Sequence, residues 1–473
     1  MLNYIVKIHF SILLFTSCAA IFYIFETSNL NFYLLDSAKK YKKAFIILTS
    51  LFFMWGFITV LVDSLIPRLR EVFELTFFQA GLVQFAFFMA YGLLSIPAGW
   101  VLSKIGYKKG ILLGLGIMGI GCLLFYPAAS YRMFPLFLIG YFILAGGMTV
   151  LQVAANPYVA VLGSEETASS RLNLSQAFNS LGTAIAPAVG AMFLLSDSIK
   201  NSDDISNLSS TAKEAYLVAE ASAVQNPFLF LASSLLLLAL IVSFIKLPNI
   251  LKKKEGFGYS EALKHKVLKM GAIGIFLYVG AEVAIGSYLV NYFLDMNMAE
   301  VIKNSDWMAS ISESILQQDL ENVDQKAIVG AFVIFYWSGA MVGRFIGAYL
   351  TKIIKPSKVL ALFTIMAISL LAISMLTTGF VAMWSILLVG LFNSIMFPTI
   401  FSLSLNGLGE YKPQASGILC TAIVGGAIIP PLYGFFTDQF DFKPALILMM
   451  LCYFYIFYFS RKSSSYIESH SEN

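Results

Sequence analysis

Charged side chains are scarce in this chain of 473 residues. Only 12% of its residues are Asp, Glu, Lys or Arg, whereas 58% are hydrophobic. An average soluble domain has about 25% charged residues. The low share therefore argues against a soluble globular protein and against a disordered chain. A formal net charge of only +4, without a basic aromatic groove, argues against a nucleic-acid-binding protein.

Histidine and cysteine are also scarce. The three histidines lie outside the long apolar stretches, which argues against a histidine proton relay or metal site there. The four cysteines lie singly in apolar stretches, so we expect neither a zinc site nor a disulfide framework. No nucleophile–base cluster or phosphate-binding loop is visible in the sequence. We therefore expect a protein that is not an enzyme and has no cofactor or bound metal.

Long apolar stretches make up most of the chain. About 20 apolar residues span a bilayer, and such a span must be helical because lipid cannot pair with open backbone groups. We therefore predict an all-α membrane protein with twelve transmembrane helices. The predicted spans are 44–66, 78–102, 110–129, 133–162, 173–195, 226–247, 271–294, 327–350, 358–378, 380–405, 415–436 and 443–460.

Residues 1–43 form an N-terminal extension with a shorter apolar segment at 10–25. This segment is short for a span, and no small-residue cleavage site follows it. An uncleaved thirteenth helix, an interfacial helix and an over-extended translation start all remain open. We favour the last and assign the extension no function.

Basic residues gather in alternate loops, around Lys39–Lys43, Lys104–Lys109 and Lys252–Lys269. Loops rich in Lys and Arg stay in the cytoplasm. We therefore expect both ends of the twelve-helix body to be cytoplasmic. The central basic cluster is interpreted as a topology signal.

Three pairs of motifs recur in the same order and indicate an internal duplication. The pairs are Gly99-x3-Ser103-Lys104 with Gly347-x3-Thr351-Lys352, Asn156-Pro157 with Phe397-Pro398, and Pro187-x-x-Gly190 with Pro431-x-x-Gly434. We predict a six-helix half at 44–247, a basic cytoplasmic linker at 248–270, a second half at 271–460 and a polar tail at 461–473. A substrate site is expected near the midplane between such halves.

The two repeated loops are predicted to turn at the cytoplasmic face. Glycine there allows close helix approach, and lysine can meet helix carbonyls or lipid phosphates. A gating role and a simple basic turn are equally well supported. The candidate gating residues are Gly99, Lys104, Gly106, Lys108, Lys109, Gly347 and Lys352.

Two carboxylates fall inside the predicted spans, Asp63 in the first and Glu282 in the seventh. A buried charge in lipid costs about 2.5–3.5 kcal/mol and usually serves a function. Both residues are predicted to couple a proton or sodium ion, with a hydrogen-bonded structural acid as the alternative. Arg344 is predicted to be a structural charge that snorkels or pairs near the cytoplasmic gate.

Amide side chains suit sugar hydroxyls because each amide both donates and accepts hydrogen bonds. Gln176 and Asn179 are one turn apart on one helix face, without a polar counterpart in the other repeat. Trp55 is a candidate for stacking on a sugar ring. Interhelical hydrogen bonding and packing are the alternatives. The candidate sugar-binding residues are Gln152, Asn156, Gln176, Asn179, Asn291, Asn393 and Trp55.

Residues 44–460 resemble the fucose permease and glucose/galactose transporter family of the major facilitator superfamily. The resemblance rests on LTSLFFMWGF, FFQAGLVQFAFF, LQVAANPYVAVLG, RLNLSQAFNSLGTAIAP, FLYVGAEVAIGSYLVNY and FPTIFSLSLNGLG. It implies a sugar–cation symporter of the bacterial inner membrane. The family's aspartate, implicated in proton coupling and sugar binding, falls on Asp63, and its glutamine and asparagine fall on Gln176 and Asn179.

The resemblance implies three differences from the fucose branch, at Gln152, Val60 and Glu282. That branch has a glutamate, an asparagine and an uncharged residue at these positions, in that order. The pattern resembles the glucose/galactose branch, so glucose or galactose is favoured over fucose or N-acetylglucosamine. Our hypothesis is that the second titratable group has moved from span 4 to span 7. A non-transporting sugar sensor is the alternative of another class. We expect a monomer in membrane lipid, with a small sugar as its substrate and no nucleic-acid partner.

Overall fold

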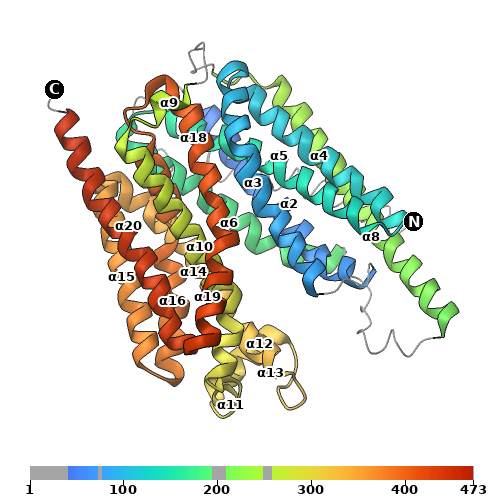
Figure 1. Ribbon diagram of the computed structural model, residues 1–473. Coiled ribbons are helices and arrows are strands. Elements are labelled where there is room, and N and C mark those ends of the chain that lie inside the picture. The colour runs from blue at the N-terminus through green and yellow to red at the C-terminus, as the bar shows by residue number, and fades with distance from the viewer. Residues whose placement is uncertain (1–40, 73–76, 194–208, 249–257, 472–473) are drawn as a thin grey trace. The chain divides into compact units, whose positions relative to one another are not determined.

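The computed structural model describes residues 41–72, 77–193, 209–248 and 258–471. This part of the chain consists of helices and turns and contains no strand (Figure 1). The all-α architecture predicted from the apolar stretches is therefore confirmed. The apolar segment at 10–25 lies outside the described residues.

Every predicted span corresponds to one helix or to two consecutive helices. Among the described residues, 11 segments are long and apolar enough to cross a membrane, and α6, which is rich in polar residues, is not among them. The unbroken helices are α2 (Lys42–Val72), α3 (Phe77–Ile105), α4 (Tyr107–Ser130), α5 (Phe134–Val161), α6 (Ala168–Phe193), α8 (Ser210–Phe244), α10 (Lys266–Asp295), α15 (Pro356–Leu376) and α20 (Phe442–Ser471).

Three spans are interrupted. The eighth is divided into α13 (Gln325–Ala331) and α14 (Val333–Ile353), and the tenth into α16 (Gly379–Asn393) and α17 (Met396–Ser404). The eleventh consists of α18 (Lys412–Thr421), a 3-10 turn and α19 (Gly425–Phe440). Breaks inside a membrane helix leave backbone groups without helical partners, so other groups must satisfy them. The remaining short helices are α9 (Tyr259–Ala262), α11 (Met298–Lys303) and α12 (Asp306–Leu316).

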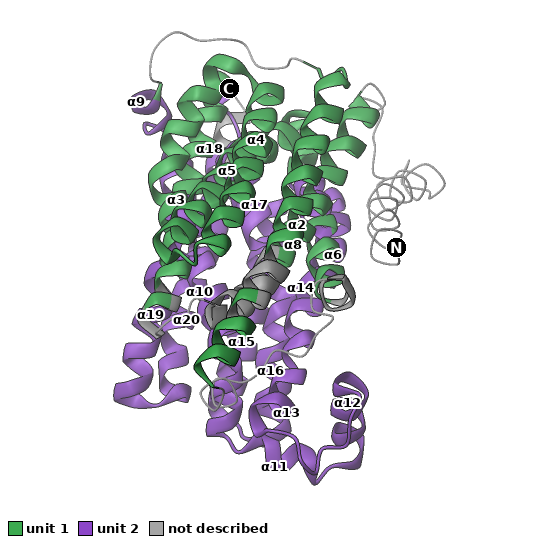
Figure 2. Ribbon diagram, turned by 90° about the vertical axis from the view of Figure 1, so that its right-hand side faces the viewer, with its two compact units in different colours: residues 1–168, 178–258, 410–421 green, residues 169–177, 259–409, 422–473 purple. Residues whose placement is uncertain are grey.

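Contacts divide the chain into two compact units, coloured in Figure 2. Unit 1 contains residues 1–168, 178–258 and 410–421, and unit 2 contains residues 169–177, 259–409 and 422–473. The start of α6 thus belongs to unit 2, and α18 belongs to unit 1. In unit 1, α4 packs along α5 and α8, and in unit 2, α10 packs along α19 and α20. The predicted domain boundaries remain predictions.

A proline inside α5 determines one contact in unit 1. Pro157 has no backbone N–H, so it cannot donate to the carbonyl oxygen of Val153 four residues earlier. The hydroxyl of Ser416 in α18 donates to this oxygen instead, at 2.8 Å. Ser416 is fully buried, so no water competes for the bond. The proline in α5 therefore creates an acceptor that holds α18 in unit 1.

We predict that Ser416→Ala lowers the free energy of unfolding by about 1–3 kcal/mol, because it leaves a buried carbonyl oxygen unsatisfied. Thermal unfolding of the purified protein in detergent measures this loss. Adding Pro157→Ala should restore part of the stability, since alanine at that position supplies the missing N–H. The control is Ser233→Ala, since the Ser233 hydroxyl is exposed and bonds only within its own helix, to the Leu229 carbonyl. Equal losses for Ser416→Ala and Ser233→Ala would contradict this explanation.

Candidate functional site

A largely buried ion pair lies within unit 2. The Glu282 carboxylate on α10 and the Arg344 guanidinium on α14 approach to 3.9 Å between Oε1 and Nη2. The exposed fractions of the two side chains are 14% and 16%. Burying two charges has a large desolvation cost, which mutual attraction offsets only when both partners are present. Removal of either partner would therefore leave the other charge without compensation.

The break between α16 and α17 holds Arg344 in place. Pro398 in α17 lacks an N–H, so the carbonyl oxygen of Ser394 has no helical donor four residues later. Arg344 Nε donates to this oxygen at 3.2 Å. The guanidinium thus uses one nitrogen for the backbone of the broken span and directs another towards Glu282. We predicted Arg344 to snorkel or pair near the cytoplasmic gate; its ion-pair partner is Glu282, and its place at a gate stays a prediction.

Tyrosines and one amide surround this pair. Asn393, at the end of α16, donates to the hydroxyl oxygen of Tyr336 at 2.7 Å and to that of Tyr453 at 3.4 Å. All three side chains are fully buried. Tyr278 lies one turn before Glu282 on α10 and interacts electrostatically with both Glu282 and Arg344. The helices α10, α14, α16 and α20 thus contribute to one polar cluster.

Three atoms of this cluster have unused hydrogen-bonding capacity. Among the described residues, Asn393 Oδ1 is buried without a hydrogen-bond partner, and the buried Tyr278 hydroxyl and Glu282 Oε1 have no partner beyond each other and Arg344. Buried polar atoms are normally paired with protein, water or a ligand. The carboxylate can therefore accept a proton, and the cluster offers hydrogen-bonding atoms to a water molecule or a hydroxyl group.

The predicted amides of unit 1 are arranged differently. Asn179 on α6 donates to the carbonyl oxygen of Phe52 on α2 at 2.9 Å. A Cβ atom at Gly56 would collide with the backbone oxygen of Asn179, so glycine permits this close helix contact. Trp55, on the same helix, is buried and lies edge-on to Phe52 at 5.6 Å between ring centroids. Asn179 thus joins two helices, which is the structural alternative we considered.

Gln152 and Asn156 lie one turn apart on α5 in unit 1. Asn156 is fully buried, whereas Gln152 is half-buried and its Oε1 has no hydrogen-bond partner among the described residues. Gln176, three residues before Asn179, is buried and belongs to unit 2. The pair predicted on one face of α6 is therefore divided between the two units.

The start of α6 is bonded to helices of unit 2. Ser170 donates to the carbonyl oxygen of Ala348 at 2.6 Å, and Asn173 donates to the hydroxyl oxygen of Thr399 at 3.2 Å. These bonds explain why residues 169–177 belong to unit 2. They were not visible in the sequence, since the partners lie far apart in the chain.

Two predicted site residues lie elsewhere. Asn291 is nine residues after Glu282 on α10, about 13 Å further along the helix axis, and lines a separate pocket. The backbone of Asp63 belongs to α2, but its side chain lies outside the described part of the structure. Its predicted role in coupling stays a prediction.

The candidate gating residues lie at three helix ends: the end of α3, the start of α4 and the end of α14. Gly106 has φ 83°, a backbone conformation that favours glycine, and separates α3 from α4. Lys108 donates to the carbonyl oxygen of Ser243 near the end of α8 at 2.7 Å, and Lys104 lies 3.8 Å from the ring centroid of Trp100.

In unit 2, a Cβ atom at Gly347 would collide with Ile395, so glycine allows α14 to approach the α16–α17 break. Gly99, Lys109 and Lys352 lie in the same helix ends, and their gating role stays a prediction.

Comparisons with known proteins bear on this arrangement. A family model described as Major Facilitator Superfamily matches residues 44–423. A glucose/galactose transporter of Brucella abortus is 47% identical over 431 residues, which cover 90% of this chain and 95% of the relative.

The chain belongs to the fucose permease and glucose/galactose transporter family of the Major Facilitator Superfamily.

Another member of this family, the L-fucose-proton symporter of Escherichia coli, is 35% identical over 439 residues, 90% of this chain and 94% of the relative. The crystal structure of the transporter FucP in the outward conformation has a TM-score of 0.79 and 33% identity. The matched region covers 89% of this chain and 98% of FucP. The twelve-helix fold expected for the family is therefore that of an integral membrane transporter.

We predict that Arg344→Ala lowers the free energy of unfolding by about 3–5 kcal/mol, because it leaves the Glu282 charge buried without a partner. Adding Glu282→Gln should recover much of this loss, which denaturant unfolding in detergent can measure. The control is Arg132→Ala, which removes a shorter but exposed ion pair with Glu214 at 2.7 Å. That change should cost about 0–1 kcal/mol. Additive losses in the double variant would show that the two charges are independent.

Proposed function

We propose that this membrane protein imports a hexose, glucose or galactose, by symport with a proton. The sugar assignment is supported by the relative from Brucella abortus, which is named a glucose/galactose transporter. The coupling assignment is carried by the buried Glu282–Arg344 pair. The two halves would alternate access to the sugar, as expected of this architecture. An inner-membrane location with cytoplasmic ends forms part of the same proposal.

The chemistry of the pair favours a proton over sodium. Hard cations such as sodium prefer several oxygen ligands. Here a permanent guanidinium charge lies 3.9 Å from the only carboxylate of the cluster and would repel a second cation. Among the described residues, no group of three His, Cys, Asp or Glu side chains could hold a metal ion. A proton needs no such shell, because it bonds directly to one carboxylate oxygen.

Protonation of Glu282 would change the partners of Arg344. A neutral carboxylic acid no longer offsets the guanidinium charge, and its new O–H becomes a hydrogen-bond donor. Arg344 keeps its bond to the Ser394 carbonyl oxygen and so links the state of Glu282 to the break between α16 and α17. Asn393 Oδ1, which has no partner, and the Tyr278 hydroxyl, which interacts with Glu282, are candidates for bonding sugar hydroxyls in that state. Sugar binding and protonation would thus favour the same arrangement.

Counterflow of labelled D-glucose in liposomes, competed by galactose, fucose and N-acetylglucosamine, tests the sugar. It needs no ion gradient and therefore separates substrate identity from coupling. Galactose should compete and fucose should not. If folded protein exchanges none of these sugars, the hexose assignment is overturned and only the fold assignment stands. A sensor that binds sugar without transporting it would give this result.

Glu282→Gln should lose sugar accumulation driven by an inward pH gradient, because glutamine cannot bind the coupled proton. Measurement of uptake into liposomes with an acidic exterior shows this directly. An imposed sodium gradient at constant pH should leave uptake by the unaltered protein unchanged. Glu321→Gln, an exposed carboxylate of the same unit, serves as the control and should keep accumulation. Undiminished pH-driven accumulation by Glu282→Gln would remove this residue from the coupling mechanism.

A further inference from the structure

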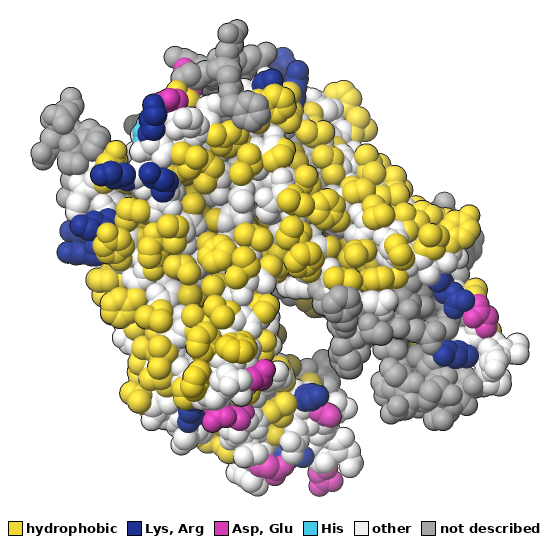
Figure 3. Space-filling view, in the orientation of Figure 1, with side chains coloured by type: hydrophobic (Ala, Val, Ile, Leu, Met, Phe, Trp, Pro, Cys, Tyr) yellow, Lys and Arg dark blue, Asp and Glu magenta, His cyan; other side chains and the backbone are white. Residues whose placement is uncertain are grey.

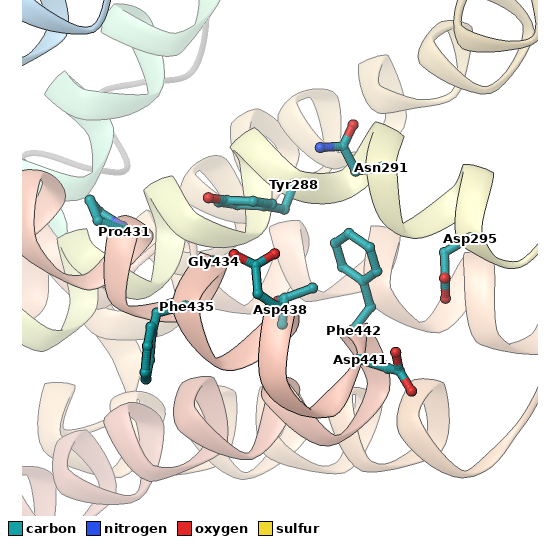
Figure 4. Close-up of a pocket in the computed structure, with 10 residues that line it drawn as sticks. Tyr288, Asn291, Asp295, Pro431, Gly434, Phe435, Asp438, Asp441 and Phe442 are labelled. Carbon is teal, nitrogen blue, oxygen red and sulfur yellow. The ribbon is translucent and has the colours of Figure 1, made fainter. Parts of the chain in front are cut away.

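A second polar cavity lies at one end of unit 2. A pocket of about 600 Å³ opens between the ends of α10 and α19 and the start of α20 (Figure 4). Its lining includes Tyr288, Asn291, Asp295, Asp438, Asp441 and Phe442. It contains no residue of the Glu282 cluster, and Asn291 is about 13 Å further along α10 than Glu282. It is therefore a separate cavity.

The charges of unit 2 show which end this is. Basic residues lie where α10 begins and α20 ends, including Lys264, Lys266 and Arg461. Figure 3 shows acidic side chains gathered at the opposite end, around α11 to α13 and the end of α19. Under the orientation predicted from the basic loops, the pocket opens towards the outside of the cell. A solute arriving from outside would meet it before the buried cluster.

Aromatic rings and acceptor oxygens line the pocket together. Figure 4 shows the Tyr288 ring and the Asp438 carboxylate directed into the space between α10 and α19, with the ring of Phe442 nearby. Asp438 lies close enough to act electrostatically on Tyr288. A Cβ atom at Gly434 would collide with the Tyr288 hydroxyl, so glycine keeps the space for that group. The side chains of Asn291 and Asp438 are exposed and line the pocket, where a solute can reach them.

This combination selects a class of ligand. Carboxylates and an amide accept hydrogen bonds from hydroxyl groups, and aromatic rings cover the apolar face of a sugar. The negative charge excludes anions. The acidic side chains do not form a metal-binding group among the described residues, so their arrangement does not suit one shared cation. The volume is within the range of small-molecule sites and exceeds that of one hexose.

We propose that this pocket is an entry site that binds a neutral hexose before it reaches the buried cluster. The proposal rests on hexose transport and adds a second binding site to it. An entry site raises the local concentration of sugar at the outer opening. Loss of the entry site should therefore lower the uptake rate at low sugar concentration and leave the maximal uptake rate unchanged.

Binding stoichiometry tests the proposal. Equilibrium binding of labelled D-galactose to the purified full chain in nanodiscs should give two sugars per chain. Asp438→Asn, which keeps side-chain size, and Gly434→Val, which crowds Tyr288, should each reduce this to one. In uptake assays both variants should raise the half-saturating sugar concentration about three- to ten-fold with the maximal rate unchanged. Asp306→Asn, the same chemical change at an exposed position outside the pocket, is the control and should keep two sites.

Each outcome has a definite meaning. One sugar per chain in the unaltered protein, unchanged by Asp438→Asn, would overturn the entry site while hexose transport stands. A change in sodium binding rather than sugar binding in Asp438→Asn would assign the pocket to a cation and also overturn it. No sugar bound by folded, unaltered protein would overturn the proposed hexose function itself. These measurements do not use Glu282→Gln. The entry-site proposal can therefore fail while the proposed hexose transport stands.

Discussion

The missing N–H of Pro398 is the constraint on which the polar cluster depends. A membrane helix cannot leave a buried carbonyl oxygen unpaired without a cost of several kcal/mol. The Ser394 oxygen therefore needs a donor from another helix, and Arg344 supplies it. Once the arginine is fixed in this way, its charge requires a carboxylate nearby, which Glu282 provides. One imino acid in a broken helix thus determines where a buried ion pair can form.

The two units distribute polar chemistry unequally. In unit 2, ionisable groups and tyrosines gather around α10, α14 and α16. In the described part of unit 1, the corresponding helices carry amides, of which Asn179 bonds to the backbone of α2. The proposed coupling role therefore falls on unit 2, whereas Asn179 in unit 1 joins two helices. Asp63, whose side chain lies outside the described residues, is the member of unit 1 that would alter this balance.

The sequence was informative about the helices and about single buried charges, because both depend on local composition. Apolar length predicted the spans, and Glu282 stood out as a carboxylate in an apolar stretch. The partner of Glu282 could not be predicted, because Arg344 belongs to a different span and the sequence places it near one end of that span. The helix breaks were also missed, because α16 and α17 form one continuous apolar stretch. The pocket between α10 and α19 was missed because its acidic residues lie near helix ends, where charge is ordinary. Asn291 was predicted with the central amides, whereas its position along α10 places it in that pocket.

The matched prolines of the two repeats allow a comparison of donors. Pro157 and Pro398 occupy equivalent places, and each exposes the oxygen four residues earlier. In one repeat the neutral hydroxyl of Ser416 donates to this oxygen, and in the other the charged guanidinium of Arg344 does. The first donor carries no charge, whereas the second belongs to an ion pair with Glu282. The same acceptor position can therefore be bonded by a neutral or by a charged donor, and only the charged one ties the broken helix to the ion pair.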